Sequence, residues 1–176
     1  FNGQPTVAYT DTKSGDLKLA TYDGKTWKKL TVDGAGGTSG RTTHPISGEI
    51  SMCVNGSGKK QTLHLFYSDS TDKDLRYAAY NGKSFTFNVV DGDGPSVNDY
   101  LDSNRVRTSS DVSVSNACVA TASAVQVFYR DESQGVLLGA VKTKAPGWVY
   151  EMVDGDRKTD GRTTGDVGFH LQAIFD

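Results

Sequence analysis

Residues 63–92 read LHLFYSDSTDKDLRYAAYNGKSFTFNVVDG, and the same pattern occurs twice more along the chain. The other copies are VAYTDTKSGDLKLATYDGKTWKKLTVDG at residues 7–34 and VQVFYRDESQGVLLGAVKTKAPGWVYEMVDG at residues 125–155. Each copy has Tyr-x-Asp near its start and Val-Asp-Gly at its end. The two aspartates of a copy lie 22, 22 and 23 residues apart, which indicates an internal repeat. The pairs are Asp11 and Asp33, Asp69 and Asp91, and Asp131 and Asp154.

A second marker follows each copy. Gly40-Arg41-Thr42-Thr43 returns as Gly161-Arg162-Thr163-Thr164, and Arg107-Thr108-Ser109 lies between them. The arginine comes eight residues after the Val-Asp-Gly aspartate in the first and third copies, but sixteen residues after it in the second. The second copy therefore carries an eight-residue insertion, which falls in residues 91–104 and is expected to form a loop.

Each repeat resolves into four short strands, A to D. Asn81-Gly82 and the equivalent Asp23-Gly24 favour two-residue hairpin turns between C and D, because both central residues need positive φ. Successive arginines of the second marker are 66 and 55 residues apart, a spacing typical of β-propeller blades. We predict an all-β fold of four-stranded antiparallel blades, without a helix beyond a turn. The expected strands are A at 46–54 and 112–120, B at 63–67, C at 75–80 and D at 85–90.

The strand order is expected to be BCD-ABCD-ABCD-A. The chain starts almost directly with a B strand, and its final segment matches strand A, since Val167 and Phe169 follow Arg162 at the same distances as Val112 and Val114 follow Arg107. We predict one propeller segment over 1–176 that forms part of a six- to eight-bladed ring. Either a longer chain, a companion fragment or a second copy would close that ring. The blades are expected at 1–45, 46–106 and 107–165, with the last strand at 166–176.

The pattern VAYTD…GDLKLATYDGKTW…TVDG…GRTT resembles the blade repeat of secreted bacterial and archaeal β-propellers, over nearly the whole chain. The resemblance implies a propeller fold and a place outside the cell. Some actinobacterial members of this class act on extracellular proteases, so the resemblance also implies a protease as one partner. Because propellers host many unrelated functions, it is specific for the fold and not for the activity.

Composition narrows the function further. A formal net charge of −2 with 23% charged residues argues against nucleic-acid binding, which usually needs a basic patch. No apolar run approaches the roughly 18 residues that span a bilayer, so no membrane partner is expected. The first residue is Phe1 and not Met, from which we expect that an N-terminal segment has been removed.

We expect no catalytic residue and no cofactor. Gly24-Lys25-Thr26 and Gly82-Lys83-Ser84 lack the upstream glycine of a phosphate-binding loop. His44, His64 and His170 lack zinc-ligand spacing, and His64 is expected to be a hydrogen-bonded strand residue. Two acidic loops offer oxygen atoms to calcium, but solvated, turn-forming aspartates are the favoured interpretation, and no metal site is predicted. Their aspartates are Asp91, Asp93, Asp99 and Asp102 in one loop and Asp154, Asp156, Asp160 and Asp166 in the other.

Trp27, Phe85 and Trp148 occupy one equivalent position, at the start of strand D. One interpretation is a ring of sugar-stacking platforms. The other is packing between blades, which we favour because a position repeated in every unit usually serves the repeat.

The insertion is the candidate partner site, because repetition breaks where a surface loop has gained a function. Tyr100 is its expected anchor, since aromatic residues dominate interface hot spots. The alternative is an excursion without a function. The residues proposed to contact the partner are Asp93, Asn98, Asp99, Tyr100 and Asp102.

Three functions are weighed. The first is a secreted, non-catalytic module that binds another extracellular protein, such as a protease, through its loops. The second is a carbohydrate-binding lectin, which the repeated aromatics favour. The third, a glycoside-processing enzyme, rests only on precedent among propellers.

Cys53 and Cys118 are predicted to form a disulfide between neighbouring blades. They lie twelve and eleven residues after Arg41 and Arg107, near the end of strand A. Strand A lines the propeller channel, where equivalent points of adjacent blades are about 5–7 Å apart, within the Cα–Cα range of a disulfide. The one-residue difference requires a bulge in one strand. Two buried free thiols are the alternative.

Overall fold

The computed structural model describes residues 1–34, 36–94, 107–155 and 161–175. Over these residues the chain is all-β, as predicted, and its one helical element is a single 3₁₀ turn, Gly58–Lys60. No helix in the described residues is long and apolar enough to cross a membrane.

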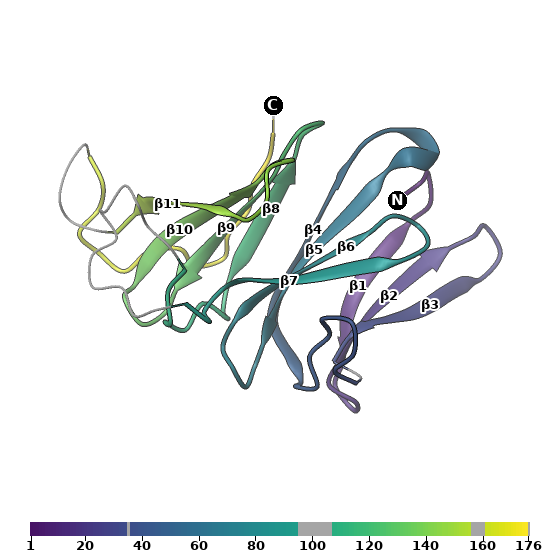
Figure 1. The fold of residues 1–176 in the computed structure, drawn as a ribbon, viewed down its shortest axis with the longest axis horizontal. Coiled ribbons are helices and arrows are strands. Elements are labelled where there is room, and N and C mark those ends of the chain that lie inside the picture. Colours follow the sequence, from purple (N-terminus) through teal and green to yellow (C-terminus); the bar gives the residue numbers. More distant parts are fainter. Residues whose placement is uncertain (35, 95–106, 156–160, 176) are drawn as a thin grey trace.

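The strands form three antiparallel sheets that follow one another along the chain (Figure 1). The first sheet has three strands, and the second and third have four each, in consecutive order. This agrees with the predicted order BCD, ABCD, ABCD. The strands are β1 (Thr6–Asp11), β2 (Asp16–Tyr22) and β3 (Trp27–Asp33); β4 (Ile46–Asn55), β5 (Thr62–Asp69), β6 (Leu75–Tyr80) and β7 (Phe85–Asp91); and β8 (Asn116–Ala120), β9 (Val125–Asp131), β10 (Val136–Lys142) and β11 (Val149–Asp154).

The hydrophobic core lies between the sheets, in two clusters. One joins Leu17, Leu19 and Val32 of the first sheet to the second sheet, and the other joins Phe66 and Tyr77 of the second sheet to the third. Each sheet alternates its side chains between two faces, so a sheet with neighbours on both sides buries both faces. This explains the run of seven buried residues from Leu63 to Asp69 in β5.

The repeated sequence markers meet at each junction between sheets. Asp33 Oδ1 accepts a hydrogen bond from the Thr42 amide at 2.8 Å, and Asp33 Oδ2 accepts one from the Tyr67 hydroxyl at 2.6 Å. At the next junction Asp91 accepts the equivalent bonds from the Thr108 amide and the Tyr129 hydroxyl, at 2.6 and 2.5 Å. The Val-Asp-Gly, Arg-Thr and Tyr-x-Asp motifs therefore fix one blade to the next.

The aspartate of Tyr-x-Asp caps the turn between strands B and C. Asp69 Oδ1 accepts hydrogen bonds from the amides of Thr71 and Asp72, and Asp131 Oδ1 accepts one from the amide of Gln134. Such caps hold the turn in place by satisfying backbone donors that the sheet leaves unpaired.

The predicted disulfide is present. Cys53 of β4 and Cys118 of β8 are bonded with a Cα–Cα distance of 5.9 Å, across 65 residues of chain. The expected bulge does not bring the cysteines to equivalent positions: the register shift between Ser47 and Ser51 inserts two residues in β4, and Cys53 pairs with His64 whereas Cys118 pairs with Val127. The one-residue offset instead turns the two side chains to opposite faces of their sheets, as two sheets that face each other require. The disulfide ties the inner strands of the second and third sheets together.

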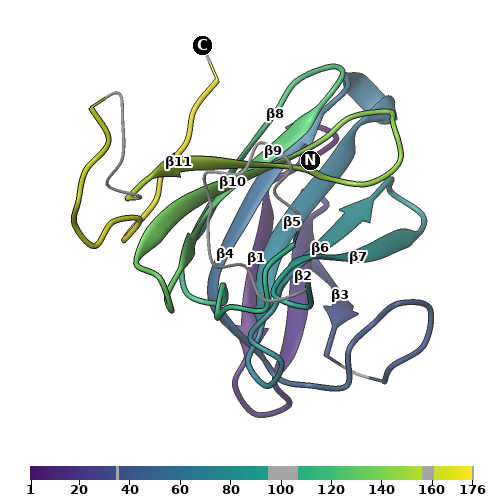
Figure 2. The ribbon, with the colours of Figure 1, turned by 60° about the vertical axis from the view of Figure 1, so that its left-hand side comes forward.

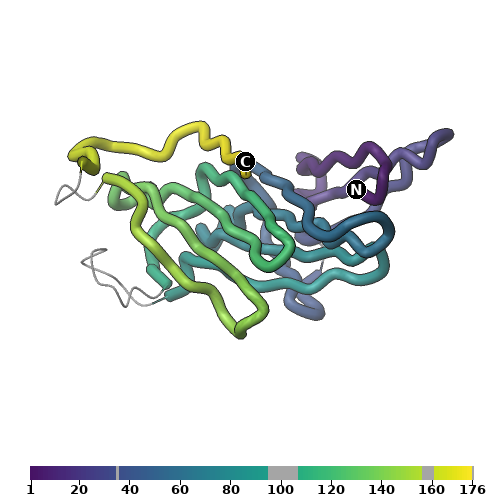
Figure 3. The backbone as a smooth tube through the Cα atoms, turned by 90° about the horizontal axis from the view of Figure 1, so that it is seen from above, coloured from purple at the N-terminus to yellow at the C-terminus, as the bar shows by residue number. Residues whose placement is uncertain are grey.

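Two expected strand boundaries differ from the structure. Strand β8 begins at Asn116 and not at 112, because residues 112–114 bond to the second sheet and not to β9: the Val112 amide donates to Lys73 O at 3.1 Å, and Val114 O accepts the Glu49 amide at 3.2 Å. Residues 166–175 form no strand, although the Val167 amide makes the equivalent hydrogen bond to Gly135 O, also at 3.1 Å. Within the described residues this segment has no B strand to pair with, and it runs beside the third sheet (Figures 2 and 3).

Candidate functional site

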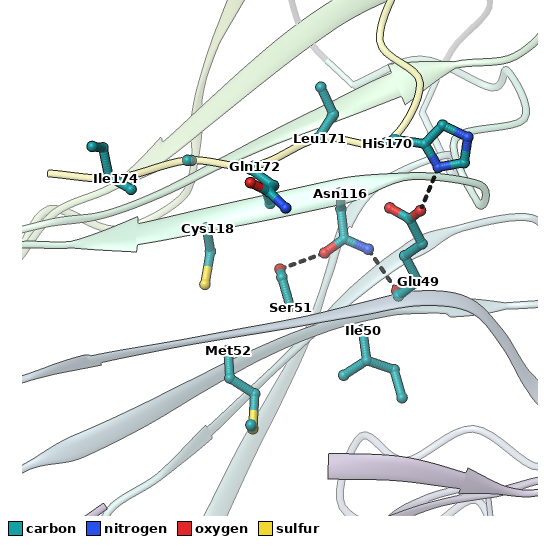
Figure 4. Close-up of a pocket in the computed structure, with 12 residues that line it drawn as sticks. Glu49, Ile50, Ser51, Met52, Asn116, Cys118, His170, Leu171, Gln172 and Ile174 are labelled. Carbon is teal, nitrogen blue, oxygen red and sulfur yellow. Dashed lines mark hydrogen bonds and ion pairs between the residues drawn. The ribbon is translucent and has the colours of Figure 1, made fainter. Parts of the chain in front are cut away.

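One cavity lies along the inner strands. It has a volume of about 620 Å³ and is bounded by β4, β8 and the C-terminal segment (Figure 4). Its polar side chains largely bond to one another: Asn116 Nδ2 donates to Glu49 O at 2.7 Å, Ser115 Oγ donates to Glu49 Oε2 at 2.7 Å, and Ser51 Oγ donates to Asn116 Oδ1. These groups are therefore satisfied within the protein, while His170 and Gln172 also line the cavity.

A smaller cleft of about 230 Å³ lies between the second and third sheets. We call it the His64 cleft. Inside it, His64 Nδ1 lies 2.8 Å from the Tyr77 hydroxyl and the two rings stack with centroids 5.8 Å apart. The expected hydrogen bond of His64 is thus confirmed at one nitrogen, while Nε2 is buried without a partner among the described residues. The cleft is lined by Asn55, His64, Tyr77, Ala122, Ser123, Ala124, Val125, Lys142, Thr143 and Lys144.

Burial sets the charge state of this cleft. Desolvation lowers the pKa of His64 to about 4 and raises the pKa of Tyr77 to about 12. Both side chains are therefore neutral at pH 7. An unpaired polar atom in a buried place costs free energy unless water or a ligand satisfies it.

Trp148 does not line the cleft, but it packs against Tyr77, which does. Its indole lies edge-on against Tyr77 and Phe66 of the second sheet, with centroids 5.3 and 5.9 Å away, and the Lys142 ammonium lies 5.4 Å from the indole centroid. The indole Nε1 is a second buried donor without a partner among the described residues. A cation, aromatic rings and two unpaired nitrogens thus gather at one junction.

The three aromatics expected at one equivalent position have different surroundings. Phe85 stacks on Tyr80 at 4.3 Å and packs against the core between the first and second sheets. Trp148 contacts the neighbouring sheet, as described above. Trp27 is 47% exposed and contacts Tyr22, with centroids 5.3 Å apart. Packing between blades therefore describes the contacts of two of the three.

A further cleft, of about 330 Å³, occupies the equivalent junction between the first and second sheets. Thr21, Asp23 and Lys28 line it together with the aromatic Tyr80. Its lining residues differ from those of the His64 cleft. The two junctions therefore share the position of a cleft but not the side chains that line it.

Most of the expected partner site lies outside the described residues: Asn98, Asp99, Tyr100 and Asp102. Asp93 is described, and it forms an ion pair with Arg107 at 2.7 Å. This bond joins the two ends of the insertion.

The acidic loops are engaged where they are described. Asp91 and Asp154 accept the amides of the following Arg-Thr turn, and Asp166 pairs with Arg130 at 2.6 Å. The other loop aspartates proposed as calcium ligands, Asp99, Asp102, Asp156 and Asp160, lie outside the described residues.

A cluster that the sequence did not reveal joins His44, Asp69 and Asp72. His44 Nδ1 lies 3.1 Å from Asp69 Oδ2 and 3.2 Å from Asp72 Oδ2. Asp69 also caps its turn and accepts the Thr42 hydroxyl at 2.6 Å, so the pKa of Asp69 is held below its usual value although burial opposes this. These hydrogen bonds and the contact with His44 explain how the Asp69 carboxylate is stabilised in a buried place without a metal ion.

No protein-family model matches the chain, and no curated protein matches it. Among solved structures it is similar to a fucose-specific lectin from Aleuria aurantia in an Hg-derivative form, with a TM-score of 0.54 and 18% sequence identity. The match covers 86% of this chain and 41% of the lectin, so the chain spans less than half of the lectin's length. This likeness supports a β-propeller-like fold, and at this identity it carries the fold alone.

Proposed function

We propose that this chain is a carbohydrate-binding module and that the His64 cleft holds the sugar. The observation that carries the proposal is that His64, which lines the cleft together with Lys142, has its Nε2 buried without a partner among the described residues, and that the same holds for Nε1 of the adjoining Trp148. The structural likeness to a fucose-specific lectin supports the same class of ligand.

The chemistry of the cleft suits a sugar. Hydroxyl groups both donate and accept hydrogen bonds, so they satisfy His64 Nε2 in either tautomer of the neutral ring. Lys142 and the Trp148 indole donate to hydroxyl oxygens. The apolar carbons of a sugar ring pack against the side chain of Tyr77. A volume of about 230 Å³ fits one monosaccharide unit and not a long chain.

We place this activity outside the cell. The Cys53–Cys118 disulfide supports this place, because disulfides persist in oxidising compartments. The resemblance to secreted propeller repeats supports it as well.

A glycan array followed by titration calorimetry with the best ligand tests the proposal. The variants are His64→Leu and Lys142→Met, each checked for its fold by circular dichroism. We expect at least a tenfold loss of affinity in both, since each removes a hydrogen bond to the ligand. Lys29→Met is the matched control, because Lys29 is exposed on β3, away from the cleft. No bound glycan, or unchanged affinity in both variants, would refute the proposal.

The second proposal is binding of an extracellular protein through the insertion. The eight extra residues between Asp91 and Arg107, closed by the Asp93–Arg107 ion pair, favour it. The resemblance to propeller repeats extends to the dispase autolysis-inducing protein of actinobacteria, which points to a protease as the partner, but no sequence comparison supports this finer resemblance. Shortening the loop by eight residues tests it: a pull-down of secreted proteases that is unchanged by the deletion contradicts the proposal.

A further inference from the structure

Two lysines and no acidic side chain line the His64 cleft. Lys142 ends strand β10, and Lys144 lies in the turn that follows it. Neither ammonium forms an ion pair with a described residue, and His64 is neutral at pH 7. The cleft therefore carries a net positive charge that the described part of the chain does not neutralise.

Lys142 lies where the other two repeats have a tyrosine, Tyr22 and Tyr80. Each of the three is the fifth residue after the leucine that pairs with the Val-Asp-Gly aspartate. These leucines are Leu17, Leu75 and Leu137. Tyr80 lines the cleft between the first and second sheets, as Lys142 lines the His64 cleft. The third repeat therefore places an ammonium at a cleft position that holds a phenol ring at the other junction.

The residue at this position contacts the aromatic side chain at the start of strand D. Tyr80 stacks on Phe85 with centroids 4.3 Å apart, and the Lys142 ammonium lies 5.4 Å from the centroid of Trp148. The face of an indole attracts a cation but carries no net charge. Trp148 therefore holds the Lys142 ammonium in place and leaves its charge uncompensated.

The turn after β10 does not need either lysine. Thr143 caps it, because its Oγ1 accepts the Ala145 amide at 3.2 Å. Asp23 caps the equivalent turn of the first sheet in the same way. A lysine ammonium has no acceptor atom and cannot form such a cap. The two lysines are therefore available to a ligand.

Glu151 of β11 does not offset the two lysines. It accepts a hydrogen bond of 2.7 Å from Gln126 and lies against Gly139 of β10. Gly139 and Lys142 are three residues apart on one strand, so they face opposite sides of the sheet. The Glu151 carboxylate thus lies on the face away from the His64 cleft.

We propose that the His64 cleft selects an acidic monosaccharide of the hexuronic acid class, with its carboxylate against Lys142 and Lys144. This inference rests on the proposed sugar site and adds the class of sugar that the site takes. The two oxygens of a carboxylate accept charge-assisted hydrogen bonds from two ammonium groups at once. The neutral His64 ring bonds to a ring hydroxyl and does not compete for the carboxylate.

The size of the cleft favours this class among the acidic sugars. A hexuronic acid has the same ring as a neutral hexose, and the cleft of about 230 Å³ fits one such unit. A sialic acid carries a three-carbon side chain in addition to its ring. A hexuronic acid therefore supplies the negative charge without exceeding the space.

Titration calorimetry with matched ligands tests the inference. The ligands are the methyl glycosides of glucuronic and galacturonic acid, each compared with its methyl ester, which keeps every hydroxyl and loses only the charge. We expect one of the acids to bind about tenfold more tightly than its ester, because charge-assisted hydrogen bonds are stronger than neutral ones. The 6-sulfate of methyl glucoside is included, and tighter binding of this sulfate than of both acids overturns the choice of a carboxylate.

The outcomes separate this inference from the proposed sugar site. Esters that bind as tightly as their acids overturn selection by charge and leave the sugar site standing. A glycan array with a bound neutral sugar, and calorimetry without binding of either acid, has the same meaning. An array without any bound glycan and calorimetry without binding refute the sugar site itself.

Lysine variants assign the selection to the two side chains. Lys142→Gln/Lys144→Gln keeps an N–H donor at both positions and removes both charges, so the ratio of acid to ester affinity should fall to about one. Lys83→Gln is the matched control, because Lys83 is an exposed lysine in the equivalent turn of the second sheet and does not line the His64 cleft. Lys144→Gln alone, on an exposed turn residue, gives the same readout if the double variant does not fold. An unchanged ratio in these variants contradicts the inference.

Discussion

The hydroxyl of Tyr67 donates a hydrogen bond of 2.6 Å to Asp33 and so joins the second sheet to the first. Both side chains are fully buried, and Arg76 Nε donates to the same carboxylate oxygen at 3.2 Å. Burial and the neighbouring carboxylate raise the pKa of Tyr67 well above its usual value, so the hydroxyl remains a donor throughout the working pH range.

Replacing this tyrosine should therefore destabilise the fold. Tyr67→Phe leaves the buried Asp33 carboxylate with one donor fewer, and we expect a loss of about 1–3 kcal/mol in the free energy of unfolding. Urea denaturation measures it. Tyr22→Phe is the control: Tyr22 is half-buried, and its hydroxyl makes no hydrogen bond to a described residue. Equal losses in the two variants would show that the Tyr67 hydroxyl does not hold the junction.

Removing the disulfide should lower stability without changing the sheets. Cys53 and Cys118 close a loop across 65 residues, and the chain-entropy model values such a loop at about 4 kcal/mol. We expect Cys53→Ala/Cys118→Ala to lower the melting temperature and to keep the far-UV circular dichroism spectrum. Alkylation of the denatured, unreduced wild type should label no cysteine in mass spectrometry, and two labelled cysteines would contradict the bond.

Asp74 should make stability depend on pH. Its counterpart Asp16 pairs with Lys18 at 2.7 Å, but Arg76, at the position of Lys18, bonds instead to Asp33 and Gly40 O. Burial and the neighbouring carboxylates raise the pKa of Asp74 to about 7.

The raised pKa fixes the sign of the effect. Because folding favours the protonated Asp74 carboxyl, the carboxyl contributes to stability in full below about pH 4. This contribution to the free energy of unfolding is lost as the pH rises through 7. We expect Asp74→Asn to raise the free energy of unfolding by on the order of 2 kcal/mol relative to the wild type at pH 8, and to change it little at pH 4. Urea unfolding at both values checks this. A gain of the same size at both would exclude titration of Asp74 as its cause.

Gly48 should be irreplaceable where β4 passes the segment before β8. Its φ is +70°, and an added Cβ would lie 2.3 Å from Ser113 O. Gly3 has a φ of +77° with nothing within 4 Å, which makes it a matched control for the backbone strain alone. We expect Gly48→Ala to lower the free energy of unfolding by several times the roughly 1 kcal/mol expected for Gly3→Ala. Thermal unfolding of both variants measures the two losses. Similar costs would mean that the close contact relaxes freely.

The sequence by itself determined the sheets and their order. The repeated motifs act locally: Val-Asp-Gly and Arg-Thr close one turn, Tyr-x-Asp caps another, and alternation within each run sets the two faces of a strand. The disulfide was also predictable, because equivalent positions in neighbouring repeats are related by one rotation. Local rules failed at 112–114, where the chain bonds to the second sheet, and at 166–175, where no B strand among the described residues pairs with the segment. No local pattern reports either partner.

Only the tertiary structure decided the candidate site. His64, Tyr77, Lys142 and Trp148 come from two repeats, and nothing in their spacing places them in one cleft. His64, Tyr77 and Lys142 each have different residues at the same position in the other repeats, so the repeat pattern hides them, and Trp148 shares its position with Trp27 and Phe85. Their chemistry depends on burial at a junction, which leaves two nitrogens without a partner among the described residues and keeps His64 neutral. Burial of that kind is a property of how sheets pack, because it arises between surfaces far apart in the chain.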